Sequence, residues 1–189
     1  GSKGDFSKAV SDFSDAISLL PDFVDAIEAR SKAYDSDADI FRKKLEGVEA
    51  NRQVAEKKYD DIQALFDDTS KLAEELIAER KTLIASMTAD IDALDGIAKN
   101  SQNNPNIRTE KDVLEVKSRV QAGVRRVKEL DREIPKAVAK LRNLGPRVKQ
   151  EHEPLMRLLK EIQSLQGNIG ALLNLVIQDQ QKAIGLLKD

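Results

Sequence analysis

Apolar residues recur every three or four positions along most of this chain, and its second half keeps one register from Val113 to Leu186. Two rows of this register begin at Val113 and Val116 and repeat every seven residues, and most of their members are apolar. Such a heptad is typical of a coiled-coil seam. The preceding half carries a second register between Phe41 and Ile97. The predicted fold class is therefore all-α, built from long paired helices.

A short polar segment separates the two registers. Residues 100–106 read Asn-Ser-Gln-Asn-Asn-Pro-Asn, and this combination predicts a turn. We expect the reversal near 99–108, with Thr109 as the N-cap of the returning helix. The two arms would then form a long antiparallel coiled-coil hairpin.

A compact spectrin-like helical bundle is the alternative that the same heptads allow. It needs two further reversals, at residues 67–70 and at Gly145-Pro146, where the residues favour a helix cap or a break. The heptad phase nevertheless continues through Pro135, Gly145-Pro146 and Pro154. Because a reversal would reset that phase, the sequence favours the hairpin.

The first 35 residues form shorter predicted helices than the rest of the chain. A helix with apolar positions from Phe6 to Leu20 ends at Pro21, and a second helix starts at Phe23. We divide the chain into a small helical pair over 1–35 and a hairpin over 36–189. The apolar face at residues 172–177 is wide enough to contact two helices. We therefore expect the C-terminal helix to pack against the helical pair, which would form the base of the hairpin.

The segment GDFSKAVSDFSDAISLLPDFVDAIEARSKAY resembles a tetratricopeptide repeat (TPR) over about a sixth of the chain. The spacing that carries the resemblance involves Gly4, Phe6, Ala9, Phe13, Ala16, Pro21 and Tyr34. Arg30 and Ser31 depart from it, because the family usually has Leu and Gly there. The resemblance implies the end of a repeat array, with further repeats upstream, whose helices offer a concave surface to a partner peptide. The positions that it would expose to the partner include Asp25, Glu28 and Lys32.

Charge is distributed unevenly between the halves. Residues 1–99 carry 14 Lys and Arg against 22 Asp and Glu, whereas residues 100–189 carry 17 against 11. Opposed charges beside a seam select partner and orientation, so we expect the two arms to match electrostatically. The other interpretation is an anion-binding stripe that includes Arg119, Arg125, Arg126 and Arg132. The basic stretch lacks the stacking aromatics of single-strand nucleic-acid modules, which argues against a nucleic-acid partner.

The chain offers few groups for chemistry. It has one histidine, His152, and no cysteine, so the sequence does not indicate a catalytic Ser-His-Asp or Cys-His set. Acidic residues within 35–46 have the spacing of calcium ligands, but Ile40 stands where a calcium loop needs glycine. We expect Ser36 to cap a helix there instead. We predict no enzyme, no catalytic residue, no cofactor and no metal site.

These patterns favour a non-enzymatic protein-protein interaction scaffold or spacer. The lack of cysteine fits a reducing, cytoplasmic location, and no apolar run approaches the roughly 18 residues that span a bilayer. A homodimer, with seams paired between chains, stays open. The alternative is a self-associating membrane-surface or filament-forming protein that docks its basic arm, 108–149, on anionic lipid. The candidate partner contacts at the turn and near the base are Asn103, Asn104, Ile107, Leu173, Val176 and Ile177.

Overall fold

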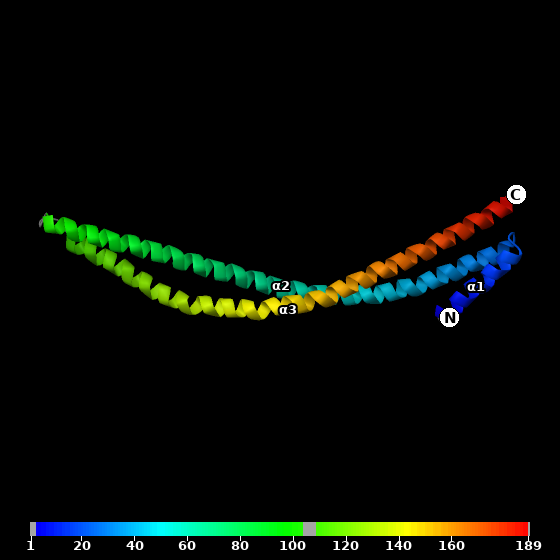
Figure 1. Ribbon diagram of the computed structural model, residues 1–189, viewed down its shortest axis with the longest axis horizontal. Helices are drawn as coiled ribbons and strands as arrows, with labels where there is room; N and C mark the ends of the chain where they lie inside the picture. The colour runs from blue at the N-terminus through cyan, green and yellow to red at the C-terminus, as the bar shows by residue number, and fades with distance from the viewer. Residues whose placement is uncertain (1–2, 104–108, 189) are drawn as a thin grey trace. The chain divides into compact units, whose positions relative to one another are not determined.

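A computed structural model of the chain describes residues 3–103 and 109–188, without the side chains of residues 3, 4, 101, 103 and 109. Within these ranges the chain forms three α-helices: α1 (Lys3–Leu19), α2 (Val24–Asn103) and α3 (Thr109–Lys188) (Figure 1). The described residues contain no strand. The all-α prediction is therefore confirmed.

The chain divides into two compact units, and each contains part of α2 and part of α3. Unit 1 consists of residues 1–59 and 151–189, and unit 2 consists of residues 60–150. The helix α1 belongs to unit 1. The predicted boundary between residues 35 and 36 lies inside α2 and stays a prediction.

The two long helices are paired as a hairpin in unit 2. The ring of Phe66 on α2 lies against Gly145 on α3. Further along α2, Met87 lies against Gly123, which comes earlier in α3. Residue numbers therefore rise on one helix as they fall on the other, and the helices are antiparallel. The predicted helical hairpin agrees with this packing.

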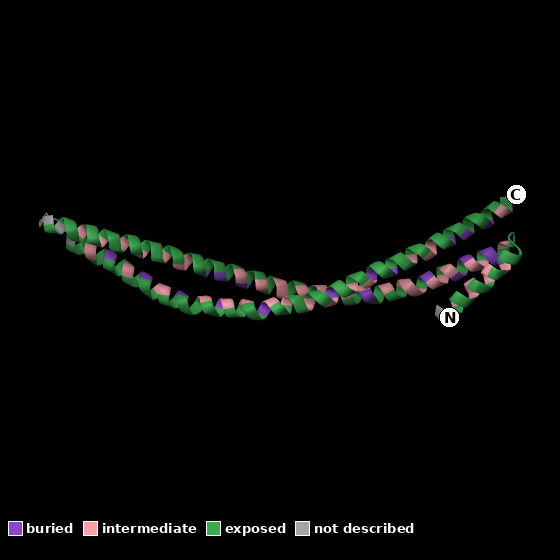
Figure 2. Cartoon of the chain, viewed as in Figure 1, coloured by how far each residue is buried: buried purple, intermediate pink, exposed green. Residues whose placement is uncertain are grey.

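The heptad positions that the sequence singles out lie at the contact between α2 and α3. On α3, every position of the two rows from Val113 to Leu186 is buried or half-buried. On α2, the same holds for every position of the register from Phe41 to Ile97 (Figure 2). The core of unit 2 is a cluster of Ala73, Leu76, Leu130 and Ala137. Unit 1 has a similar cluster of Val48, Ile162 and Leu165.

The reversals that a compact bundle needs do not occur. The helix α2 continues through residues 67–70, where the Thr69 hydroxyl donates to the carbonyl of Leu65 at 2.7 Å instead of capping a helix. The helix α3 continues through Gly145-Pro146. An interior proline costs about 3 kcal/mol, but Leu144 stays buried beside it, and burial along the seam offsets the local loss. The bundle alternative is wrong, and α3 continues through Gly145-Pro146 as the unbroken heptad phase predicts.

A third cluster holds the helix ends of unit 1 together. The helix α1 ends at Leu19, just before Pro21, and the amide of Leu20 donates to the carbonyl of Ala16 at 2.9 Å. Ile17 of α1, Ala26 and Ile27 of α2 and Ala183 of α3 form the buried cluster, with Ala16, Val24 and Leu186 packed around it. Three helices therefore meet in unit 1, whereas two meet in unit 2.

Two glycines in helix interiors predict different responses to alanine. A Cβ at Gly47 would meet nothing within 4 Å, so Gly47→Ala is expected to raise the free energy of unfolding by about 1 kcal/mol through helix propensity. A Cβ at Gly123 would lie 2.7 Å from the sulfur of Met87, so that side chain must move and Gly123→Ala should gain clearly less. Urea denaturation followed by circular dichroism measures both. Equal stabilisation by the two substitutions would contradict the close packing at Gly123.

Candidate partner-binding surfaces

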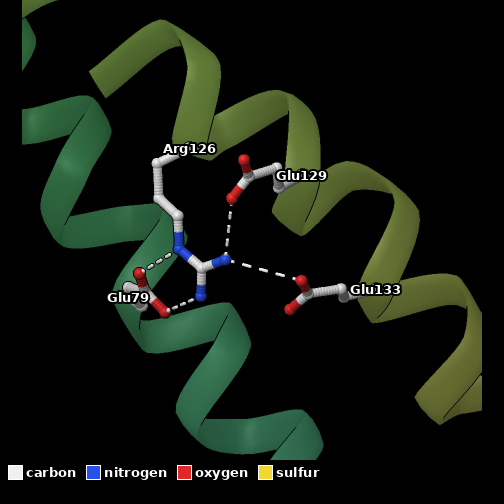
Figure 3. A network of polar contacts seen from close by, with 4 residues as sticks. All are labelled: Glu79, Arg126, Glu129 and Glu133. Atoms are coloured by element: carbon white, nitrogen blue, oxygen red, sulfur yellow. Dashed lines mark hydrogen bonds and ion pairs between the residues drawn. The ribbon is translucent and has the colours of Figure 1, made fainter. Parts of the chain in front are cut away.

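An arginine network connects the two helices of unit 2. Arg126 of α3 reaches across to Glu79 of α2, with Nε donating to Oε1 at 2.6 Å and Nη2 to Oε2 at 2.9 Å (Figure 3). Its Nη1 also donates to Glu129 at 3.1 Å and to Glu133 at 3.5 Å, both on its own helix. The bidentate pair holds α2 and α3 in one register, because both partners are fixed to rigid helices.

Two further ion pairs join the same helices. Arg119 donates to Asp90 at 2.9 Å, and Arg80 donates to Asp131 at 2.7 Å. The pairs of Arg119 and Arg126 have the sense that the uneven charge distribution predicts, whereas Arg80–Asp131 has the opposite sense. They also use two of the four arginines proposed as an anion-binding stripe, since Arg119 and Arg126 are held by carboxylates.

The carboxylates in these pairs predict an acid-sensitive hairpin. The hydrogen bond from Arg126 lowers the pKa of Glu79, and the one from Arg119 lowers the pKa of Asp90. A lowered folded-state pKa stabilises the fold above the unfolded value, about 4.3 for Glu, and the effect is lost as pH falls through the folded value. Titration by carboxylate NMR should place Glu79 below that value, and Arg126→Gln should move its pKa up. As a control, Arg125→Gln should leave it unchanged; an equal effect would exclude the pair as the cause.

The remaining cations of α3 in unit 2 point to solvent. Between residues 117 and 149, all three acidic residues are in ion pairs, whereas nine basic residues are exposed and form no ion pair within the described ranges. We call this set the basic face: Lys117, Arg125, Lys128, Arg132, Lys136, Lys140, Arg142, Arg147 and Lys149. It runs for about 48 Å along the helix at 1.5 Å per residue. Arg125 and Arg132 of the predicted stripe belong to it.

A row of exposed isoleucines lies beside the seam of unit 2. Ile77, Ile84 and Ile91 of α2 follow one another at seven-residue spacing, and their exposed fractions are 50%, 38% and 54%. We call these three residues the isoleucine row. A second exposed pair, Leu65 and Leu72, lies on the other flank of the seam with fractions of 40% and 50%. The isoleucine row was not predicted from the sequence, although its seven-residue spacing next to the seam is visible there.

A buried ion pair joins the three helices of unit 1. Arg30 of α2 donates from Nε and Nη2 to the two oxygens of Asp179 on α3, at 2.8 and 2.6 Å. Its Nη1 donates to the hydroxyl of Ser14 on α1 at 3.2 Å, and its guanidinium carbon lies 6.0 Å from the ring centre of Tyr34. The hydrogen bond to Asp179 raises the pKa of Arg30. Arg30, one of the two residues that depart from the TPR spacing, therefore connects these three helices.

A hollow of about 320 Å³ opens between α2 and α3 in unit 1. It is lined by Glu28, Ser31, Lys32, Gln180, Ala183, Ile184 and Leu187. The predicted partner residues Glu28 and Lys32 therefore lie beside the C-terminal turns of α3. Asp25, the third, lines a separate hollow of about 390 Å³ between α1 and α2.

The other predicted partner residues divide between seam and surface. Val176 is buried in the seam and Leu173 is half-buried, whereas Ile177 is 49% exposed. Of the residues predicted at the turn, Asn104 and Ile107 lie outside the described residues. Asn103 is the last residue of α2, and its side chain also lies outside the description.

The two groups of residues weighed for chemistry lie on helices. His152 is exposed, with its ring 5.4 Å from that of Tyr59. The acidic segment 35–46 is helical throughout, and Arg42 pairs there with Asp39 and with Asp35. Ser36 donates to the carbonyl of Lys32 at 2.9 Å inside α2, so its prediction as a helix cap is wrong. No group of three potential metal ligands occurs in the part of the chain that the structure describes.

Comparison with known proteins adds no family. No protein-family model, no curated protein and no solved structure matches this chain. Among the described helices, none has the length and apolar character needed to cross a membrane.

Proposed function

We propose that the protein is a non-enzymatic scaffold, a coiled-coil hairpin that binds other proteins through apolar residues outside its own seam. The isoleucine row carries this proposal. The seam positions of α2 and α3 are occupied by each other, yet Ile77, Ile84 and Ile91 repeat the heptad period on a solvated flank. A seven-residue apolar repeat fits the seam of a further helix. Because about half of each isoleucine is already buried, covering the rest contributes on the order of 1 kcal/mol per residue.

The remaining sequence expectations fit within this proposal. The TPR-like pair at the start of the chain supports a role in a larger interaction array, and the lack of cysteine supports a cytoplasmic location. The matched ion pairs of unit 2 would keep α2 and α3 in register while a partner binds.

The test compares two matched double variants. Ile77→Lys with Ile84→Lys replaces two of the three isoleucines of the row, and Leu65→Lys with Leu72→Lys makes the same change on the other flank at similar exposure and identical spacing. Affinity capture from extracts of the source cells, read by quantitative mass spectrometry, should identify a protein that the wild type and the leucine variant retain and the isoleucine variant loses. Equal capture by all three proteins would refute binding at the row. Circular dichroism should show unchanged helix content in both variants.

The basic face supports a second candidate, attachment to an anionic lipid surface. Nine exposed cations lie along about 48 Å of one helix, and the three acids between them are held in ion pairs. Each such cation near the membrane attracts phosphate headgroups by about 1 kcal/mol. Sedimentation with phosphatidylserine vesicles should then be strong at low salt and weak at high salt. Arg125→Glu with Arg132→Glu should abolish it, whereas Lys57→Glu with Lys58→Glu on α2 of unit 1 should not. No sedimentation at low salt would exclude this candidate.

A further inference from the structure

The C-terminal turns of α3 carry an apolar stripe that unit 1 leaves largely exposed. It follows helical spacing on the flank of the seam and consists of Leu173, Ile177, Gln180, Ile184 and Leu187, which we call the terminal stripe. Ile177, Ile184 and Leu187 are 49%, 53% and 69% exposed. The hollow lined by Glu28, Lys32 and Ile184 lies along it.

The helix α1 leaves this flank open because it packs elsewhere. Its Ile17 joins Ala26 in the buried cluster, and its Ser14 receives the hydrogen bond from Arg30. Ala26 and Arg30 lie on one flank of α2, whereas the hollow is lined by Glu28 and Lys32 on the other. The third helix of unit 1 therefore does not serve as the cover for the terminal stripe.

We infer that the cover is a second copy of this chain, bound antiparallel to form a homodimer. The stripe reads Leu, Ile, Gln, Ile, Leu in either direction; its leucines lie seven residues before and after Gln180, and its isoleucines three before and four after. A two-fold axis at Gln180 sets Leu173 against Leu187 of the second copy, and brings Ile177 next to Ile184 with an offset of one residue. A two-fold interface requires this self-complementarity, whereas an unrelated partner does not.

The centre of the stripe suits a two-fold axis. Gln180 is its only polar member, and a glutamine amide both donates and accepts hydrogen bonds, so two copies satisfy each other when they meet. A single polar residue inside an apolar seam fixes the register of pairing, since any shift leaves the amides opposite apolar side chains. The pairing is therefore specific to one alignment.

Charge along α2 agrees with the same axis. The Arg30–Asp179 pair places residue 30 of α2 level with residue 179 of α3, next to the proposed axis. Glu28 and Lys32 lie two residues on either side of that level, and both line the hollow. Antiparallel association therefore brings Glu28 of each copy toward Lys32 of the other, which adds two attractive contacts at the edge of the interface.

Light scattering on the intact chain tests the dimer. At about 100 µM the wild type should have twice the 21.0 kDa mass of one chain. Ile184→Lys should raise the dissociation constant at least about tenfold, because it places a charge in the seam. Leu114→Lys, on the same helix at 60% exposure against 53%, is the control and should leave the dimer intact. A monomeric wild type, or equal dissociation by both variants, overturns the inference.

Charge exchange at the axis separates this dimer from any other association. Gln180→Glu and Gln180→Lys should each be monomeric, since like charges meet at the axis, and an equimolar mixture should recover the dimer mass. The chain has no cysteine, so Gln180→Cys should give a disulfide-linked dimer on oxidation, whereas Gln163→Cys, exposed on the same helix, should not. If either charged variant stays dimeric alone, or if both cysteine variants cross-link equally, the axis does not lie at Gln180.

Discussion

Leu130→Ala is expected to lower the free energy of unfolding by about 2–5 kcal/mol. Leu130 is fully buried, and its neighbours in the cluster include Ala73 and Ala137, whose short side chains cannot extend to fill the space that it leaves. The substitution therefore loses apolar burial and also creates a cavity between two helices that are held apart by the rest of the seam. Guanidinium denaturation followed by far-UV circular dichroism measures the loss.

The matched control for this prediction is Leu114→Ala on the same helix. Leu114 is 60% exposed and belongs to no row of the seam, so the same chemical change should alter the free energy of unfolding by less than about 0.5 kcal/mol. Similar losses at the two positions would mean that the hairpin is stabilised by helix propensity instead of by interhelical packing.

The seam was predictable because it depends on period alone. A heptad places the same face inward on any helix, so the rows from Val113 and from Phe41 identify the buried positions without knowledge of the partner. The same period outweighs the local signal at Gly145-Pro146, which by itself favours a break. The cost of a proline is confined to one turn, whereas the seam on both sides favours a continuous helix.

The candidate surfaces were harder to predict, because they consist of residues that the fold neither buries in the seam nor uses in an ion pair. Arg125 and Arg126 are neighbours in a basic stretch, yet Arg126 meets Glu79 and Arg125 faces solvent. The heptad alone places Arg126 beside the seam and Arg125 away from it. The carboxylate that Arg126 meets, however, follows from the register of α2 against α3, which the turn fixes and which sequence gives only approximately. Folding about residue 103 would place Phe66 near Lys140, whereas Phe66 lies against Gly145. A shift of this size changes which charges lie opposite one another.

Arg30→Leu is expected to lower the free energy of unfolding by about 3–5 kcal/mol, although leucine is the residue that the TPR spacing favours there. Asp179 is only 5% exposed, and Arg30 supplies both of its hydrogen bonds. Removing the guanidinium leaves a buried carboxylate without a partner, which costs more than the added leucine can recover. Thermal and urea denaturation of the single variant measure the loss.

The double variant separates the value of the pair from the cost of breaking it. Arg30→Leu combined with Asp179→Leu removes both charges, and replacing a buried ion pair by apolar side chains is commonly neutral or stabilising, so most of the loss should be recovered. Arg52→Leu is the matched control, because Arg52 has the same 20% side-chain exposure but pairs only with Glu49 and Glu56 of its own helix. Its expected loss is below about 1 kcal/mol. A double variant as unstable as Arg30→Leu alone would show that the guanidinium itself, through Ser14 and Tyr34, holds the three helices together.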